Sequence, residues 1–171
     1  QLHEEDDIVN ISKSLDLNTS YNGSNNISKE YKKQDTNSKK TNKILNITAS
    51  IYASENDLDN CLLLNDSKNV VEALQGNLFM LKGNTLVTPP VSEGCLNGVM
   101  RKQILSLAKK MVNIEVVEEA ISPFDLQKAD ELFITNVIKG IQPITKYRKK
   151  EFTIDFSKLL VQKLNEILNS N

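Results

Sequence analysis

One carboxylate, that of Glu72, interrupts the apolar segment between residues 69 and 81. It lies between Val71 and Ala73 in a stretch whose residue types predict a β-hairpin. A carboxylate on such a hairpin more often lies on the solvated face. If Glu72 is buried instead, it needs a cationic or proton-donating partner, because an unpaired buried carboxylate is costly. Glu72 is therefore the first candidate for a functional residue.

A second candidate is the helix that we expect to begin near Gly98. Its first turn, at Val99 and Met100, has backbone N–H groups without intrahelical partners, and the positive end of the helix dipole lies there. An anion could bind at this helix start, where Gly98 would let it approach the backbone closely. The alternative is an ordinary helix start without a ligand.

The elements that position these residues follow from the spacing of the apolar side chains. Apolar residues at helical spacing predict helices over 44–52, 98–111 and 159–168, and Ser122 followed by Pro123 predicts the start of a short helix. Short apolar runs bounded by turn residues predict strands over 62–64, 70–73, 77–81, 85–88, 114–117, 131–136 and 140–144. This order predicts an α+β fold with a mostly antiparallel sheet flanked by helices.

The composition places the core in the second part of the chain. The 171 residues are enough for one compact domain. Apolar residues are sparse up to about residue 43, so we expect 1–43 to be a polar linker or irregular segment and 44–171 to be the folded domain. The chain begins with Gln rather than Met, and we expect it to be a processed or truncated segment.

Charge and cysteine content exclude several classes of partner. The net charge of −1, with both signs well mixed, predicts no binding to nucleic acid or to an anionic membrane. Cys61, Cys95 and the lone His3 lack the spacing of metal ligands, so no metal site is expected. The chain has no apolar run near the length of a membrane span, and the cytosol is the expected location.

Two sequence blocks resemble the second domain of the class IV aminotransferases. The first block comprises Leu62-Leu63-Leu64-Asn65, Val70-Val71-Glu72-Ala73, Gly76-Asn77-Leu78-Phe79, Thr88-Pro89-Pro90 and Gly98-Val99-Met100-Arg101. The second comprises residues 129–136 and 140–144. This family includes the branched-chain aminotransferases and the aminodeoxychorismate lyases. The resemblance implies the fold type IV architecture, with a barrel-like sheet, and pyridoxal 5′-phosphate (PLP) as cofactor.

The resemblance also implies a role for each candidate residue. Glu72 would hydrogen-bond the pyridine nitrogen of PLP and keep it protonated. Gly98, Val99 and Met100 would bind the phosphate at the helix start. Donors from Thr135, Asn136 and Val137 would reach the phosphate and the substrate carboxylate. The alternative is that Thr135 and Asn136 are simply polar residues at a strand end; the two interpretations are equal for Asn136, and Thr135 is the weaker candidate. Branched-chain aminotransferases usually have Gly-Thr-Ala here, where this chain has Asn136-Val137-Ile138, so the difference leaves the substrate open.

Family members bind PLP covalently through a lysine that lies upstream of this glutamate. In the segment Lys39-Lys40-Thr41-Asn42-Lys43, the usual spacing selects Lys39, and Lys40 fits only with one residue deleted. A lysine amine whose pKa can be depressed by its surroundings suits this role. The alternative is that this segment is a solvated run of lysines.

Two hypotheses for the function follow from the resemblance. In the first, the chain is the cofactor-binding part of a homodimeric enzyme that transfers an amino group between a small amino acid and a 2-oxo acid, or eliminates pyruvate from aminodeoxychorismate. In the second, the chain is a non-catalytic form of the family fold that serves as a binding or oligomerisation module. Residues 1–38 show no clear counterpart of the first domain of the family.

Overall fold

The computed structural model describes residues 10–12, 26–33, 47, 49–51, 53–55 and 60–169, the first two ranges by their backbone. Residues 47, 49–51 and 53–55 are helical, in agreement with the predicted helix over 44–52. The other helices are η2 (Val91–Glu93), α2 (Val99–Ala108), α3 (Pro123–Leu126) and α4 (Asp155–Asn169). The strands are β1 (Asn10–Ser12), β2 (Asn26–Lys33), β3 (Asn60–Asn65), β4 (Val70–Ala73), β5 (Asn77–Lys82), β6 (Thr85–Thr88), β7 (Glu115–Glu118), β8 (Glu131–Asn136), β9 (Gly140–Ile144), β10 (Lys146–Tyr147) and β11 (Lys150–Glu151).

The described strands form two sheets. One has the order β11-β10-β1-β2-β3-β4 and the other β7-β6-β5-β8-β9. All neighbouring strands are antiparallel except the pairs β2–β3 and β6–β7. The predicted α+β fold with a mostly antiparallel sheet is confirmed. The predicted barrel, however, is not closed: between β4 and β5 the chain turns tightly, and only an isolated bridge joins Ala73 to Gly76.

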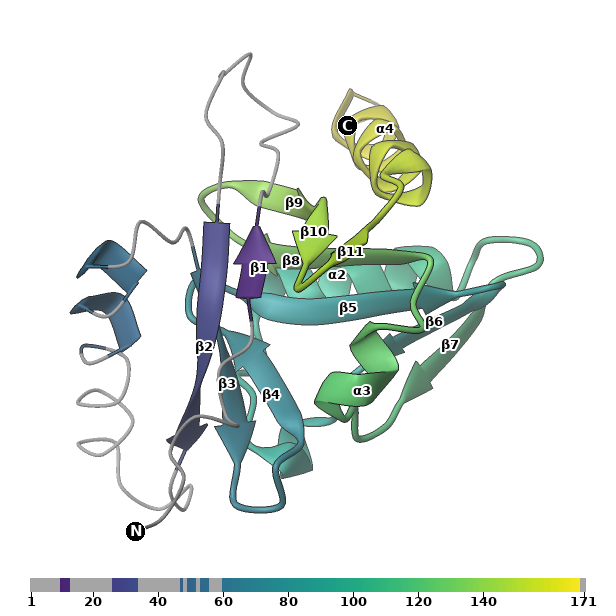
Figure 1. Cartoon of the computed structure of the whole chain (residues 1–171). Coiled ribbons are helices and arrows are strands. Elements are labelled where there is room, and N and C mark those ends of the chain that lie inside the picture. The colour runs from purple at the N-terminus through teal and green to yellow at the C-terminus, as the bar shows by residue number, and fades with distance from the viewer. Residues whose placement is uncertain are drawn as a thin grey trace, which may run out of the picture.

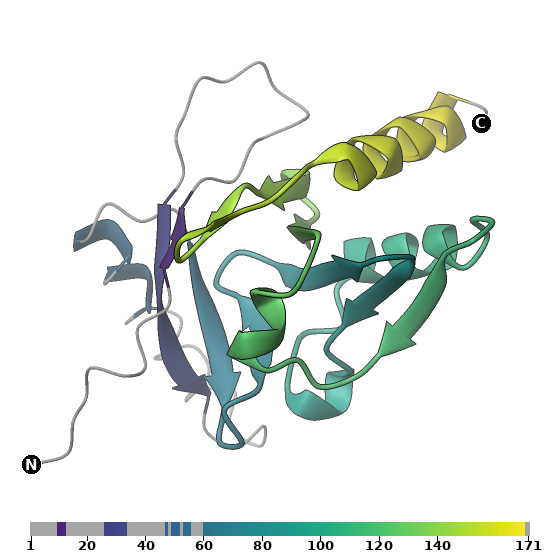
Figure 2. The same ribbon diagram turned by 45° about the vertical axis from the view of Figure 1, so that its right-hand side comes forward.

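The strands of the two sheets run across each other, as Figures 1 and 2 show for β2 and β5. Because β5 is covered on both faces, its apolar residues form a continuous run. Leu78 and Met80 belong to a core cluster that also contains Leu62 and Leu63 of β3. Phe79 and Leu81 point to the opposite face, into a second cluster with residues of α2 and α4. The five-stranded sheet is therefore the middle layer of the domain.

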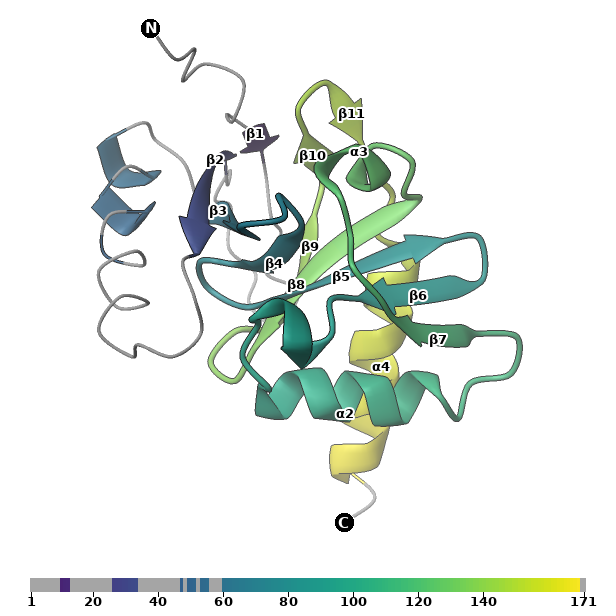
Figure 3. The ribbon, with the colours of Figure 1, turned by 90° about the horizontal axis from the view of Figure 1, so that it is seen from below.

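Helices α2 and α4 cover the outer face of the five-stranded sheet. Ile104 of α2 and Phe156 of α4 share a cluster with the stacked rings of Phe79 and Phe133, whose centroids lie 5.1 Å apart. Figure 3 shows α2 crossing α4, and side chains of both helices line a common groove. No helix in the described part of the chain combines the length and apolar character that a membrane crossing needs.

A buried carboxylate fixes the start of α4. Glu131 on β8 is 3% exposed. It accepts hydrogen bonds from the backbone N–H groups of Phe156 and Ser157, at 2.7 and 3.0 Å, and from the Ser157 hydroxyl at 3.0 Å. A carboxylate is favourable at this position because the first N–H groups of a helix lack partners and carry its positive end.

Residues 10–12 and 26–33 are strands, within the stretch where the composition predicts a polar linker or irregular segment. Strands β1 and β2 lie there, and β2 pairs with β1 on one side and with β3 on the other. Ladder hydrogen bonds join backbone groups, so β2, with the sequence NISKEYKK, enters the sheet despite its few apolar residues. The boundary at residue 43 stays a prediction.

Candidate functional site

An open cavity of about 310 Å³ lies beside the β4–β5 turn, where the chain passes from one sheet to the other. Three segments that are distant in sequence meet around it: the end of β4 with its turn, the start of α2, and the end of β8. All seven residues that were predicted to bind the cofactor line this cavity, namely Glu72, Gly98, Val99, Met100, Thr135, Asn136 and Val137. The rest of its lining is formed by Ala73, Leu74, Gln75, Gly76, Asn77 and Leu96.

Glu72 is buried at the end of β4. Its side chain is 5% exposed, so the interpretation that places it on a solvated face is wrong. Its Oε2 atom accepts a hydrogen bond from the backbone N–H of Leu96 at 2.9 Å. Among the described residues that line the cavity, Glu72 is the one with a charged side chain. It can therefore serve as an acceptor for a cationic or N–H-bearing ligand.

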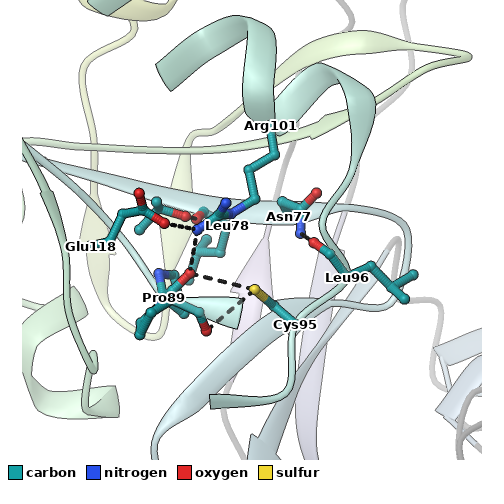
Figure 4. A network of polar contacts seen from close by, with 9 residues as sticks. Asn77, Leu78, Pro89, Cys95, Leu96, Arg101 and Glu118 are labelled. Carbon is teal, nitrogen blue, oxygen red and sulfur yellow. Dashed lines mark hydrogen bonds and ion pairs between the residues drawn. The ribbon is translucent and has the colours of Figure 1, made fainter. Parts of the chain in front are cut away.

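Asn77, which carried no predicted role, fixes the segment that leads into α2. Its amide nitrogen donates to the Leu96 carbonyl at 2.7 Å, and Figure 4 shows the two residues facing each other. A Cβ atom added to Gly98 would lie 2.4 Å from the Asn77 side-chain oxygen. A side chain at position 98 would therefore displace the Asn77 amide, so the packing of Asn77 gives a second reason for the glycine beside the predicted approach of a ligand.

The start of α2 offers unpaired backbone donors to the cavity. Gly98 is the N-cap residue, and no side chain caps the helix there. The N–H groups of Val99 and Met100 belong to the first turn, which cannot be satisfied within the helix. The helix has ten residues and no acidic residue in its first turn, so the positive end of its dipole is not offset locally. This arrangement suits an anionic ligand.

The side chains of Thr135 and Asn136, at the end of β8, differ in their hydrogen bonding. Thr135 is 1% exposed, and its hydroxyl oxygen has no hydrogen-bond partner among the described residues. The Asn136 side chain is bonded within the protein on both sides: its amide nitrogen donates to the Gln75 carbonyl at 2.8 Å, and its oxygen accepts from Ile138 N–H and Lys139 N–H. Thr135 therefore has more side-chain bonding capacity left for a ligand than Asn136.

Gly76 allows the β4–β5 turn to approach β8. A Cβ atom at this position would lie 2.4 Å from the Thr135 carbonyl oxygen. That oxygen belongs to a strand paired on both sides, so it cannot move aside easily. The glycine therefore sets how closely Glu72 and Thr135 are brought together around the cavity.

Two predicted residues cannot be placed. Lys39 and Lys40 lie outside the described residues, so their relation to the cavity stays a prediction. In the described part of the chain, no group of three His, Cys, Asp or Glu side chains is arranged to hold a metal ion.

The sequence analysis also missed an ion pair next to the site. Arg101 is 2% exposed and pairs with Glu118 at 2.6 Å. Its spacing to Ile104, Leu105 and Ala108 places it on the buried face of α2. That spacing is visible in the sequence and indicates a buried position, but buried helix positions are normally occupied by apolar residues, so it did not single out an arginine.

Comparisons with known proteins agree on one family. The family model for amino-transferase class IV matches residues 8–147. A proposed branched-chain-amino-acid aminotransferase of Methanocaldococcus jannaschii is 41% identical over 106 residues, which are 62% of this chain and 36% of that protein. The aminodeoxychorismate lyase of Vibrio harveyi is 28% identical over 134 residues, 78% of this chain and 48% of that enzyme.

A solved structure supports the same relationship. The branched-chain aminotransferase of Thermoproteus uzoniensis, crystallised with norvaline, superposes with a TM-score of 0.68 and 26% identity. The superposition covers 72% of this chain and 42% of that protein. The chain thus spans less than half the length of each of these three relatives.

Proposed function

Because the chain belongs to the class IV aminotransferases, we propose that it binds PLP in the cavity beside the β4–β5 turn and takes part in amino-group transfer between a small amino acid and a 2-oxo acid. The observation that carries this proposal is the convergence of Glu72, the α2 start and Thr135 on one cavity. The family assignment rests on residues 8–147, which are most of the chain.

The donor and acceptor groups of the cavity fit the two ends of PLP. A protonated pyridine ring needs an acceptor, and Glu72 is a buried carboxylate. A phosphate needs several donors, and the N–H groups of Val99 and Met100 and the Thr135 hydroxyl are donors. A fit of this kind explains why this buried hydroxyl has no partner among the described residues, since such groups are normally satisfied.

The proposed mechanism assigns a role to each of these residues. When bound, PLP supplies an electron sink for the pair of electrons released at the substrate Cα. Glu72 would hold the proton at the pyridine nitrogen, which maintains that capacity. The first turn of α2 and Thr135 would bind and orient the phosphate. Lys39 would bind the cofactor covalently and move the proton at the substrate Cα.

The exposed side chains around the cavity favour an amino acid with an apolar side chain as substrate. Leu96, Val99 and Val137 line the cavity and are 67%, 62% and 70% exposed. The relatives named as branched-chain aminotransferases are consistent with this choice. Pyruvate elimination from aminodeoxychorismate is the second candidate. It is favoured by the lyase relative and by Asn136-Val137-Ile138, which differs from the Gly-Thr-Ala run of branched-chain aminotransferases.

We also propose that the chain forms a homodimer in the cytoplasm. The apolar rim formed by Leu96, Val99, Val137 and Ile138 would be covered in such a dimer. Light scattering of the purified chain tests this part: a mass of one chain at micromolar concentration would contradict it. A dimer that binds no PLP would favour the alternative of a non-catalytic oligomerisation module.

The central experiment is a titration of the purified chain with PLP, followed by visible absorption. We expect the absorption of lysine-bound cofactor in the wild type, its loss in Lys39→Ala, and its retention in the matched control Lys40→Ala. Absence of the band in the wild type would refute cofactor binding. Retention of the band in Lys39→Ala and its loss in Lys40→Ala would reassign the lysine.

Substrate assays then separate the two reactions. Transamination requires a 2-oxo acid acceptor and converts it to an amino acid, whereas the lyase releases pyruvate from aminodeoxychorismate without an acceptor. We expect acceptor-dependent transfer from aliphatic amino acids. Acceptor-independent pyruvate release, with no transfer, would select the lyase.

A further inference from the structure

Arg101 connects the first turn of α2 to the ends of two strands. Its Nη2 atom donates to the Pro89 carbonyl at 2.9 Å and to Glu118 Oε2 at 2.6 Å (Figure 4). Pro89 directly follows β6, and Glu118 is the last residue of β7. These two strands are paired in register, with Thr88 opposite Glu118. A single guanidinium group therefore ties α2 to one edge of the five-stranded sheet.

The position of this cation is unfavourable for stability by itself. A positive charge in the first turn of a helix opposes the helix dipole. Burial of a charge is also costly, and even a good ion pair often does no more than offset that cost. The Nε atom of Arg101 has no partner among the described residues, so its bonding is incomplete. An apolar residue at this position of the buried helix face would satisfy the packing equally well.

Arg101 lies next to the ligand-binding groups without lining the cavity. Val99 and Met100, the two preceding residues, do line it. No side chain caps α2 at Gly98, so the helix start itself contains nothing that holds its first turn in place. The links that do hold it come from Arg101 on one side and from the segment anchored by Asn77 and Glu72 on the other.

We propose that Arg101 is a positioning residue: through Pro89 and Glu118 it fixes the first turn of α2 so that the N–H groups of Val99 and Met100 are oriented toward the cofactor phosphate. This inference rests on the proposed function. Because the bonds of Arg101 go to Pro89 and Glu118, its effect acts through the start of α2, at the phosphate end. Its loss weakens binding of a phosphorylated ligand more than binding of the same ligand without phosphate.

The test compares the affinities of the full chain for PLP and for pyridoxal, which lacks the phosphate. We expect Arg101→Met and Glu118→Gln to raise the Kd for PLP about tenfold and the Kd for pyridoxal by less than about twofold. About tenfold is the usual loss of affinity when a residue that orients a ligand-binding group is removed. Arg101→Lys keeps the charge, and its ammonium group can donate to the two acceptors that the single Nη2 atom bonds, so it should retain more of the PLP affinity than Arg101→Met.

Two control variants separate this effect from general destabilisation. Glu72→Gln removes the charge beside the ring but keeps an oxygen that can accept from the Leu96 N–H, so it should weaken PLP and pyridoxal by the same factor. Lys128→Met breaks the exposed pair with Asp125, and should leave both affinities unchanged. Thermal melting of each variant without ligand shows whether a change in affinity merely follows a change in stability.

Equal losses for PLP and pyridoxal in Arg101→Met and Glu118→Gln would overturn the inference, as would unchanged affinities. If Arg101→Met does not fold, the affinities of Glu118→Gln test the inference, because the Glu118 side chain is 39% exposed and its replacement perturbs the core less. A wild-type chain that binds PLP no better than pyridoxal would show that α2 holds no phosphate. A wild type that binds neither ligand would instead refute the proposed function.

Discussion

Replacement of Thr135 by valine should change stability and cofactor affinity in opposite directions. The Thr135 hydroxyl is buried and has no partner among the described residues. A buried hydroxyl without a hydrogen bond costs about 1–3 kcal/mol. Thr135→Val removes that group at nearly constant shape, so the ligand-free chain should become more stable by about 1–2 kcal/mol. For a chain of this size, that is a rise in Tm of roughly 2–8 °C.

The same variant should bind PLP less tightly. A hydrogen bond from a hydroxyl to a charged group contributes about 1.5–3 kcal/mol, and each 1.4 kcal/mol is a factor of about ten in Kd. We therefore expect at least about a tenfold loss of PLP affinity. Thr135→Ser is the matched control, because it keeps the hydroxyl and should keep the affinity.

Urea unfolding of the ligand-free chain and a fluorescence titration with PLP measure the two effects. A Thr135→Val chain that is less stable than the wild type would mean that the hydroxyl is already satisfied in the ligand-free protein. An unchanged Kd would mean that it does not contact the cofactor. Either result refutes the assignment of Thr135 as a phosphate donor.

Three further predictions concern the elements that hold the cavity. Glu131→Gln should lower the free energy of unfolding, measured in urea, by about 2–3 kcal/mol, because two backbone N–H groups of α4 donate to its charged carboxylate. The exposed control Glu119→Gln should change the free energy of unfolding by less than about 0.5 kcal/mol. Gly76→Ala should destabilise the chain and weaken PLP binding together, since the new Cβ would lie 2.4 Å from a strand carbonyl; a fully stable variant would contradict the tight approach. Ser122 and Asp125 form a capping box at the start of α3, in which each side chain bonds the backbone N–H of the other residue. The Ser122 hydrogen bond lowers the pKa of Asp125 below its usual value of 3.8. The stability that this capping box contributes is therefore present above that pH and is lost as the pH falls through the lowered pKa. Ser122→Ala should therefore cost about 1 kcal/mol near neutral pH, and the difference from the wild type should shrink in acid unfolding; a constant difference would show that Asp125 does not titrate with the fold.

Much of the fold could be predicted from local patterns. The hairpin around residues 82–84, the Ser122-Pro123 helix start and the amphipathic α4 all depend on residues within a few positions of each other. The candidate residues Glu72 and Gly98 could also be selected, because the two sequence blocks that resemble the family contain them; the residue types alone left a solvated carboxylate and an ordinary helix start as alternatives. Strand β2 could not, since its pairing partners are backbone groups of β1 and β3 and its side chains are mostly polar.

The burial of individual polar groups was less predictable. Glu131 and Arg101 lie in segments whose apolar spacing was interpreted correctly, yet both are charged and buried. Their partners are far along the chain: Ser157 for Glu131, and Pro89 and Glu118 for Arg101. A pattern of residue types gives no information about such distant pairs.

The sequence by itself determined which residue types the chain has available for binding, and the order of the helices and strands that carry them, because both depend on short-range preferences of the backbone. Only the tertiary structure decided that β4, α2 and β8 meet around one cavity. It also decided that the Asn136 side chain bonds to the two adjacent turns, whereas the Thr135 hydroxyl has no partner in the part of the chain that the structure describes. The physical reason is that hydrogen-bond satisfaction depends on which groups packing brings within about 3 Å of each other, and that is a property of the whole fold.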